Sequence, residues 1–182
     1  MRTIVAITGA SGAIIGIKLL ETLRGEKYLI VSENAQEIVE YETDYTLDYV
    51  KSLADRVYEN SEMNVDIASG TTKFDAMVIA PCSTSTLAKI NCGIADNLIT
   101  RVASVALKEG RKLILVPRET PASTVMLRNM YELSQIGVRI ILPVPSFYLR
   151  PKNIDDVANY IVGKILDSLE MKHTLYESYS PQ

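Results

Sequence analysis

The sequence of 182 residues holds one histidine, two cysteines and no tryptophan, and these scarcities narrow its possible chemistry. The histidine, His173, lies near the C-terminal end of the sequence, a position that disfavours a Ser-His-Asp hydrolase. Cys82 and Cys92 have neither the dense pattern of a secreted disulfide scaffold nor the spacing of metal ligands. We therefore expect a reduced, cytoplasmic compartment, no metal site, and chemistry run by carboxylates, lysine, arginine, tyrosine or a bound cofactor.

Long hydrophobic runs and positive charge are also scarce. No window approaches the ~20 apolar residues that a membrane-spanning helix needs, so we expect a soluble protein without a membrane partner. The formal net charge of −3 argues against a nucleic-acid partner. Acidic residues predominate between positions 33 and 66, and basic residues between 101 and 152. A small anionic ligand would therefore find its cationic partners in the second half of the chain.

The stretch 3–16 reads T-I-V-A-I-T-G-A-S-G-A-I-I-G and predicts a buried strand, a tight loop and a helix. Glycines permit the sharp turn from strand to helix, and Ser11 falls where an N-cap is expected. Such a loop presents backbone N–H groups at the positive end of a helix dipole, which suits a phosphate. The alternative is that these residues simply form a tight, capped turn.

Four more short apolar runs predict strands, each followed by a loop rich in proline or small polar residues. The strands are expected at residues 28–32, 76–80, 112–116 and 139–142, the helices at 14–23, 34–43, 97–108, 123–136 and 154–169, and a polar connection with room for one short helix at 55–73. This alternation indicates parallel strands with helices on both faces. We predict a three-layer, doubly wound α/β fold, Rossmann-like or flavodoxin-like, formed by a single domain over residues 1–182.

Ligands of such folds collect at the carboxyl ends of the strands, so the loops there mark the expected site. Ser32 ends the second strand, although it could equally cap the following helix. Residues 83–86 read S-T-S-T at the start of a helix, where capping needs one hydroxyl and four favour a ligand site. Arg118, Glu119 and Tyr148 follow the next two strands. All these side chains should converge on one crevice.

Six motifs, in order along nearly the whole chain, resemble the flavin prenyltransferases of the UbiX type. They are T-G-A-S-G after the first strand, E-T-D at 42–44, P-C-S-T-x-T-L from Pro81, R-x-A-x-V-A-L-K at 101–108, P-R-E-T-P from Pro117 and P-x-P-x-F-Y from Pro143. The resemblance implies an enzyme that attaches a dimethylallyl group from dimethylallyl phosphate to N5 and C6 of reduced FMN. The product would be the prenylated-FMN cofactor of a partner decarboxylase of the UbiD type.

The resemblance also assigns roles by position. FMN would be held by Gly9, Ala10, Ser11, Ser32, Ser83, Thr84, Ser85, Thr86 and Arg118. The prenyl phosphate would be held by Tyr148 and Lys164, with Ser11, Glu42, Arg101, Lys108 and Glu119 around the reacting atoms. Glu119 is the carboxyl expected to give a proton to the departing phosphate. Lys164 replaces the arginine of many relatives, which keeps the charge and loses a bidentate grip. No metal is implied.

Members of this family assemble as homo-oligomers, commonly dodecamers, with flavin sites between subunits. Tyr41, Tyr45 and Tyr49 recur at intervals of four and would line one side of a helix if that helix continued so far, as a subunit contact or core stripe. Two other functions stay open. An FMN-dependent decarboxylase of peptidyl cysteine shares the fold, although it should carry a catalytic histidine early in the chain. A non-catalytic FMN-binding subunit would bind flavin without turnover.

Overall fold

Six strands form one parallel sheet in the order β3-β2-β1-β4-β5-β6. The protein is represented by a computed structural model that describes residues 1–177. The strands are β1 (Arg2–Ile7), β2 (Glu26–Val31), β3 (Arg56–Glu59), β4 (Ala76–Cys82), β5 (Lys112–Pro117) and β6 (Arg139–Ile140). Every neighbouring pair is parallel. The predicted doubly wound α/β architecture is therefore confirmed.

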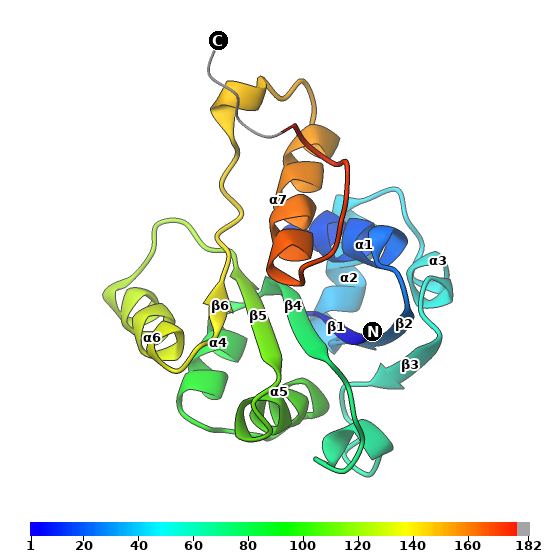
Figure 1. Ribbon diagram of the computed structural model, residues 1–182, viewed down its shortest axis with the longest axis vertical. Helices are drawn as coiled ribbons and strands as arrows, with labels where there is room; N and C mark the ends of the chain where they lie inside the picture. Colours follow the sequence, from blue (N-terminus) through cyan, green and yellow to red (C-terminus); the bar gives the residue numbers. More distant parts are fainter. Residues whose placement is uncertain (178–182) are drawn as a thin grey trace.

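Helices cover both faces of this sheet, as Figure 1 shows. One layer holds α1 (Ala13–Thr22), α2 (Glu33–Glu42), α3 (Leu47–Ser52) and α7 (Ile154–Ser168). The other holds α4 (Thr84–Asn91), α5 (Leu98–Lys108) and α6 (Thr124–Gln135). The described residues also contain two 3-10 turns, η1 (Asp66–Ala68) and η2 (Phe147–Leu149). Within residues 1–177, each helix is too short or too polar to cross a bilayer.

The core is two apolar layers, one on each face of the sheet, because successive side chains of a strand point to opposite faces. In β1, Ile4 and Ala6 join the layer beneath α4, α5 and α6. Val5 and Ile7 join the layer beneath α1 and α7. A strand that is buried on both faces is apolar at every position, so it appears in the sequence as an unbroken apolar run. These strands could therefore be predicted although their residues do not alternate between apolar and polar.

Strand order reverses between β1 and β4, which lie side by side although β2 and β3 come between them in the chain. In an open parallel sheet, this reversal leaves a crevice outside the carboxyl ends of the two strands. The loop 8–12 and Ser83, the single residue between β4 and α4, follow those ends. The fold therefore places both hydroxyl-rich and glycine-rich motifs at the switch point.

Three expectations are corrected. The connection predicted at 55–73 contains the edge strand β3 as well as η1. The strand expected at 139–142 ends at Ile140, and the chain then leaves the sheet as a segment, 141–150, which includes η2 and which we call the arm. The arm projects beyond the sheet beside α7 (Figure 1). The tyrosine stripe is not on one helix, because α2 ends at Glu42 and α3 begins at Leu47.

Candidate active site

The loop after β1 presents backbone N–H groups to an anion. Gly12, not Ser11, is the N-cap of α1, with φ of 105° and no side-chain cap hydrogen bond. The expectation that Ser11 caps this helix is thus wrong, because the chain enters α1 through a left-handed residue that favours glycine. The Gly12 N–H donates instead to Glu42 Oε2 at 2.7 Å. A carboxylate thus lies at the helix N-terminus, where a phosphate is also favoured.

Thr8 joins this loop to the one after β4. Its hydroxyl donates to the Pro81 carbonyl at 2.8 Å and accepts the Ser83 N–H at 2.8 Å. Thr8 is 2% exposed, so both bonds are shielded from water. Ser11 and residues 83–86 accordingly lie at the same end of the sheet, as predicted. Sequence reasoning missed Thr8, although its place directly after an apolar strand was a signal.

Two of the predicted FMN-binding hydroxyls act as helix caps. Ser32 Oγ accepts the Ala35 N–H at 3.3 Å and caps α2. Ser83 Oγ accepts the Thr86 N–H at 3.2 Å, caps α4, and donates to Thr86 Oγ1 at 2.9 Å. No hydrogen bond within residues 1–177 uses the side chain of Thr84 or Ser85. The α4 terminus thus carries two hydroxyls, those of Thr84 and Ser85, that take no part in the cap.

Arg118 links three loops. Its backbone N–H donates to the Cys82 carbonyl at 3.3 Å, and its Nε donates to the Ser11 carbonyl at 3.2 Å. Glu119, the next residue, is exposed, and its Oε1 accepts the Thr120 N–H at 3.0 Å. The side chains of Arg118 and Glu119 form no ion pair. The carboxyl group of Glu119 is therefore not neutralised by its neighbour.

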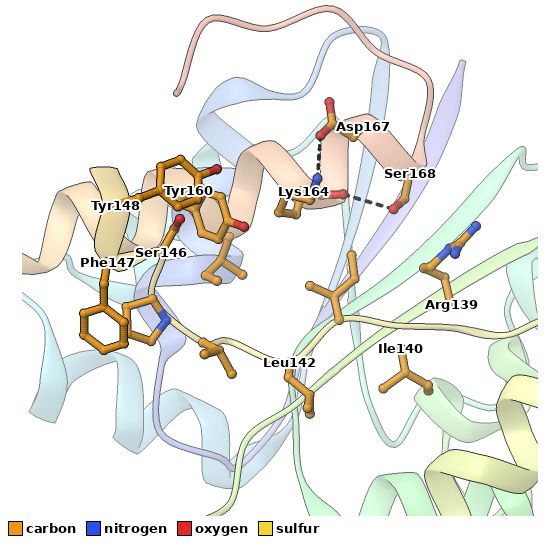
Figure 2. A pocket seen from close by; sticks show the side chains of 14 residues that line it. Arg139, Ile140, Leu142, Ser146, Phe147, Tyr148, Tyr160, Lys164, Asp167 and Ser168 are labelled. Atoms are coloured by element: carbon orange, nitrogen blue, oxygen red, sulfur yellow. Dashed lines mark hydrogen bonds and ion pairs between the residues drawn. The ribbon is translucent and has the colours of Figure 1, made fainter. Parts of the chain in front are cut away.

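Three cavities lie beside these loops or along the arm, and one of them, of about 870 Å³, is lined by Ser11, Gly12 and Glu42 among other residues. A small one of about 190 Å³ is lined by Ser11, Gly12 and Arg118 together with apolar residues of α7, and we call it the loop cavity. A larger one of about 890 Å³ lies between the arm and α7, and we call it the arm pocket. Tyr148 and Lys164 both line the arm pocket (Figure 2), so the two predicted phosphate-binding residues are brought together. Sequence reasoning missed other polar side chains on its wall: Ser146, Tyr160, Asp167 and Ser168.

Arg101 and Lys108 lie away from this crevice within one chain. Lys108 ends α5 just before β5 begins, at the amino ends of the strands, and pairs with Glu109 at 2.9 Å. Arg101, two turns earlier, donates from Nε to the Ala68 carbonyl at 2.9 Å. These two side chains cannot meet Tyr148 or Lys164 of their own chain without a large rearrangement.

The residues at the carboxyl ends of the strands fit FMN. The Gly12 N–H already holds a carboxylate, which shows that this terminus receives an anionic oxygen. A Cβ at Gly9 would lie 2.7 Å from Asn34 Cβ, so the loop is packed as closely as glycine permits. Backbone N–H groups, hydroxyls and a guanidinium suit a phosphate ester and the polar edge of a heterocycle. Among residues 1–177, no group of three or more acidic, histidine or cysteine side chains could hold a metal ion.

The sheet order and the donor-rich loops at the switch point define a doubly wound α/β protein with a site for an anionic ligand. The model of the family described as Flavoprotein matches residues 1–166. The chain is 46% identical over 180 residues to the flavin prenyltransferase UbiX of Thermoplasma acidophilum, covering 98% of this chain and 100% of that protein. It therefore belongs to the Flavoprotein family and, within it, to the UbiX flavin prenyltransferases.

Two solved structures resemble this one along the whole chain. A protein described as AnUbiX (PadA1), in complex with FMN and dimethylallyl pyrophosphate, has a TM-score of 0.96 at 42% identity, covering 100% of this chain and 98% of that one. A dodecameric FMN-dependent UbiX-like decarboxylase from Escherichia coli O157:H7 has a TM-score of 0.96 at 41% identity, with full coverage of both chains. The family expected from the six sequence motifs is confirmed.

Proposed function

We propose that this protein is a flavin prenyltransferase, which joins a dimethylallyl group from dimethylallyl phosphate to N5 and C6 of reduced FMN. The observation that carries the proposal is a shared wall: Ile161 of α7 lines both the loop cavity and the arm pocket. A flavin at the loops and a prenyl phosphate in the arm pocket would therefore be neighbours. The AnUbiX structure, with FMN and dimethylallyl pyrophosphate together, supports this arrangement.

In this proposal, the strand-end loops hold FMN. The residues concerned are Gly9, Ala10, Ser11, Ser32, Ser83, Thr84, Ser85, Thr86 and Arg118. Ser32 can do so while capping α2, because a hydroxyl that accepts one N–H still has a proton to donate. The Ser83 hydroxyl already donates to Thr86 Oγ1, so it would bind FMN through its second lone pair or after redirecting that proton. When bound, reduced FMN supplies the electron-rich nucleophile.

The chain's own residues would assist cleavage of the allylic C–O bond. Lys164 meets the negative charge that develops on the departing phosphate. Glu119 gives that phosphate a proton. The ring of Tyr148 faces the allylic group and stabilises its positive charge. Glu42, which holds the loop through Gly12, keeps the N-terminus of α1 oriented toward the flavin.

We further propose that the protein works as a homododecamer and passes its product to a UbiD-type decarboxylase. The E. coli relative is described as dodecameric. Large apolar side chains are exposed at the arm and the start of α7, with Phe147 78% and Ile154 71% exposed, as expected of a surface that a neighbouring subunit covers. Arg101 and Lys108 would then serve a site that also contains the arm of another subunit. The two unpaired thiols, Cys82 and Cys92, suit a reducing, cytoplasmic location.

The decisive experiment is anaerobic incubation of the pure protein with reduced FMN and dimethylallyl phosphate, followed by mass measurement of the extracted flavin. A gain of one dimethylallyl unit supports the transferase, and a parallel incubation with the diphosphate gives the donor preference. Unchanged flavin would indicate a non-catalytic FMN-binding subunit. A cysteine-peptide decarboxylase is less supported, because it is expected to carry a catalytic histidine early in the chain, and the sole histidine of the sequence is His173.

A further inference from the structure

Four polar side chains meet at the C-terminal half of α7, and two of them, Lys164 and Asp167, line the arm pocket. Lys164 and Asp167 come from the helix, and Lys164 Nζ lies 3.2 Å from Asp167 Oδ2 (Figure 2). His173 and Tyr176 come from the segment 171–177, which runs back along α7 (Figure 1). Lys164 Nζ also donates to the Tyr176 hydroxyl at 3.3 Å. The lysine ammonium therefore has two partners, one from each element.

Asp167 is the acceptor at the centre of this cluster. Its Oδ2 accepts a short hydrogen bond from the Tyr176 hydroxyl in addition to the one from Lys164. Its Oδ1 lies 3.0 Å from His173 Nε2. The Leu175 N–H donates to His173 Nδ1, so Nδ1 is unprotonated and the ring proton is on Nε2, directed at Asp167. Three donors thus share the negative charge of one carboxylate.

Gly163 makes room for the segment that supplies Tyr176. A Cβ at this position would lie 2.5 Å from Tyr176 Cε1 and 2.9 Å from His173 Cε1. The Tyr176 ring also packs edge-on against Tyr160, with centroids 5.1 Å apart. The tyrosine is consequently fixed by contacts that do not involve Lys164, and its hydroxyl is a rigid reference point for a flexible side chain.

A lysine ammonium is a point charge on four rotatable bonds, and it lacks the preorganised fork of arginine. Here two of its three protons are directed at Tyr176 and Asp167, which leaves the third for a ligand in the arm pocket. The hydrogen bond to Tyr176, and then the one to Asp167, raise the pKa of Lys164, so the ammonium keeps its charge.

We propose that Tyr176 is a positioning residue, whose hydroxyl acts with Asp167 to hold the Lys164 ammonium where it receives the phosphate of the prenyl donor. The inference rests on the proposed function, which assigns that phosphate to Lys164. Tyr176, which lies outside α7, thus gives the Lys164 ammonium a fixed orientation. The rigid guanidinium of an arginine would have such an orientation without a partner. Tyr176 touches neither the donor nor the flavin.

The test is Tyr176→Phe, which removes the hydroxyl and keeps the ring. Inorganic phosphate is titrated calorimetrically into the FMN-free and the FMN-loaded protein, and the KM for dimethylallyl phosphate is measured separately. We expect phosphate affinity to fall about tenfold, as for a lost hydrogen bond to a charged group, with FMN affinity unchanged. Gly163→Ala, which displaces the ring, should lower phosphate affinity similarly. Tyr58→Phe is the matched control, because it removes a phenol-to-aspartate bond of 2.8 Å on the opposite edge strand.

The same substitution is repeated in a Lys164→Ala background, which separates positioning from general loss of structure. If Tyr176 acts through Lys164, adding Tyr176→Phe to Lys164→Ala should not lower the phosphate affinity any further. The inference would be overturned if Tyr176→Phe lowered phosphate affinity as much in the Lys164→Ala background as in the wild-type background. It would also be overturned if the Tyr176→Phe protein bound phosphate as tightly as wild type. Normal phosphate binding by Lys164→Ala would overturn it too. A wild-type protein that binds phosphate through Lys164 and Tyr176 but leaves the flavin mass unchanged would refute the proposed function and leave the inference standing.

Discussion

Glu119 can be distinguished from an ordinary surface carboxylate by one isosteric change. An exposed ion pair would contribute ~0 to 1 kcal/mol, and no such pair with Arg118 forms. If Glu119 protonates the departing phosphate, Glu119→Gln retains shape and FMN affinity and slows the chemical step about 10² to 10⁴-fold. The measurement is single-turnover prenylation of pre-bound reduced FMN at saturating dimethylallyl phosphate.

The control for that change is Glu62→Gln. Glu62 also accepts a nearby backbone N–H, that of Glu59 at 2.9 Å, and lies outside the three cavities. It should react at the wild-type rate. A Glu119→Gln rate within about threefold of wild type would lie below the general-acid range. Glu119 would then not be the proton donor, and that role would fall to the phosphate itself or to Tyr148.

The two cysteines should differ sharply in reactivity. Cys82 is fully buried, and burial raises the pKa of its thiol, so the reactive thiolate is suppressed near neutral pH. Cys92 is exposed. We expect native Cys92→Ala protein to show no reactive thiol toward a disulfide reagent, and one per chain in denaturant. Rapid native labelling of that variant would show that Cys82 is accessible and would contradict a purely structural role.

The role of a residue was predictable where it depends on neighbouring residues in the sequence. It was unpredictable where it depends on tertiary contacts. The motif S-T-S-T marked the start of α4 correctly, because hydroxyl side chains favour a helix N-terminus through contacts with adjacent residues. Ser11 was misassigned because the left-handed turn at Gly12 moves the cap by one position. The contact of Tyr176 with Lys164 depends on a segment folding back along α7, and no periodicity in the sequence encodes that.

At the scale of elements, a comparison of two serine helix caps can distinguish a capping role from a ligand-binding role. Ser83 caps α4, and Ser123 caps α6 by accepting the Met126 N–H at 3.2 Å. Either serine replaced by alanine should lower the free energy of unfolding by about 1 kcal/mol. Ser83→Ala alone should also weaken FMN binding, measured by flavin fluorescence. Equal FMN affinity in the two variants would mean that Ser83 serves the helix alone.

Of the five strands that sequence reasoning identified, β1, β2, β4 and β5 are largely buried on both faces, and β6 is a short edge strand. β3 was not predicted, because it is a four-residue edge strand in which Tyr58 alone is buried, so it lacks an apolar run. β6 was predicted two residues too long because Ile141 and Leu142 continue its apolar pattern into the arm. Apolar residues in the arm reflect the pocket and the exposed surface, which a hydrophobic pattern cannot distinguish from a strand.

For the whole molecule, the separation of Lys108 from Lys164 predicts complementation between subunits. Lys108 lies at the amino ends of the strands, whereas Lys164 lines the arm pocket. If one site uses Lys108 of one subunit and Lys164 of another, co-assembled Lys108→Ala and Lys164→Ala chains rebuild about a quarter of the sites. Each variant alone should be inactive. The readout is prenylated flavin formed by the co-expressed, co-purified oligomer.

The control co-expresses two differently tagged chains that both carry Lys108→Ala and should remain inactive. Absence of activity in the mixed oligomer, with both chains shown to be present, would place the two lysines in the same chain's site. That outcome would contradict a site shared between subunits.

The switch point has a further consequence, for the order in which a ribosome delivers the strands. β1 can pair with β2 soon after both emerge, whereas its other edge waits for β4, and the tie between Thr8 and Pro81 spans 73 residues. At about 5 to 20 residues per second, that wait is roughly 4 to 15 seconds. During it, the nascent chain presents an apolar strand edge that any other extended chain could pair with. The interval between the synthesis of β1 and that of β4 is thus the period in which this sheet is most open to wrong strand pairing.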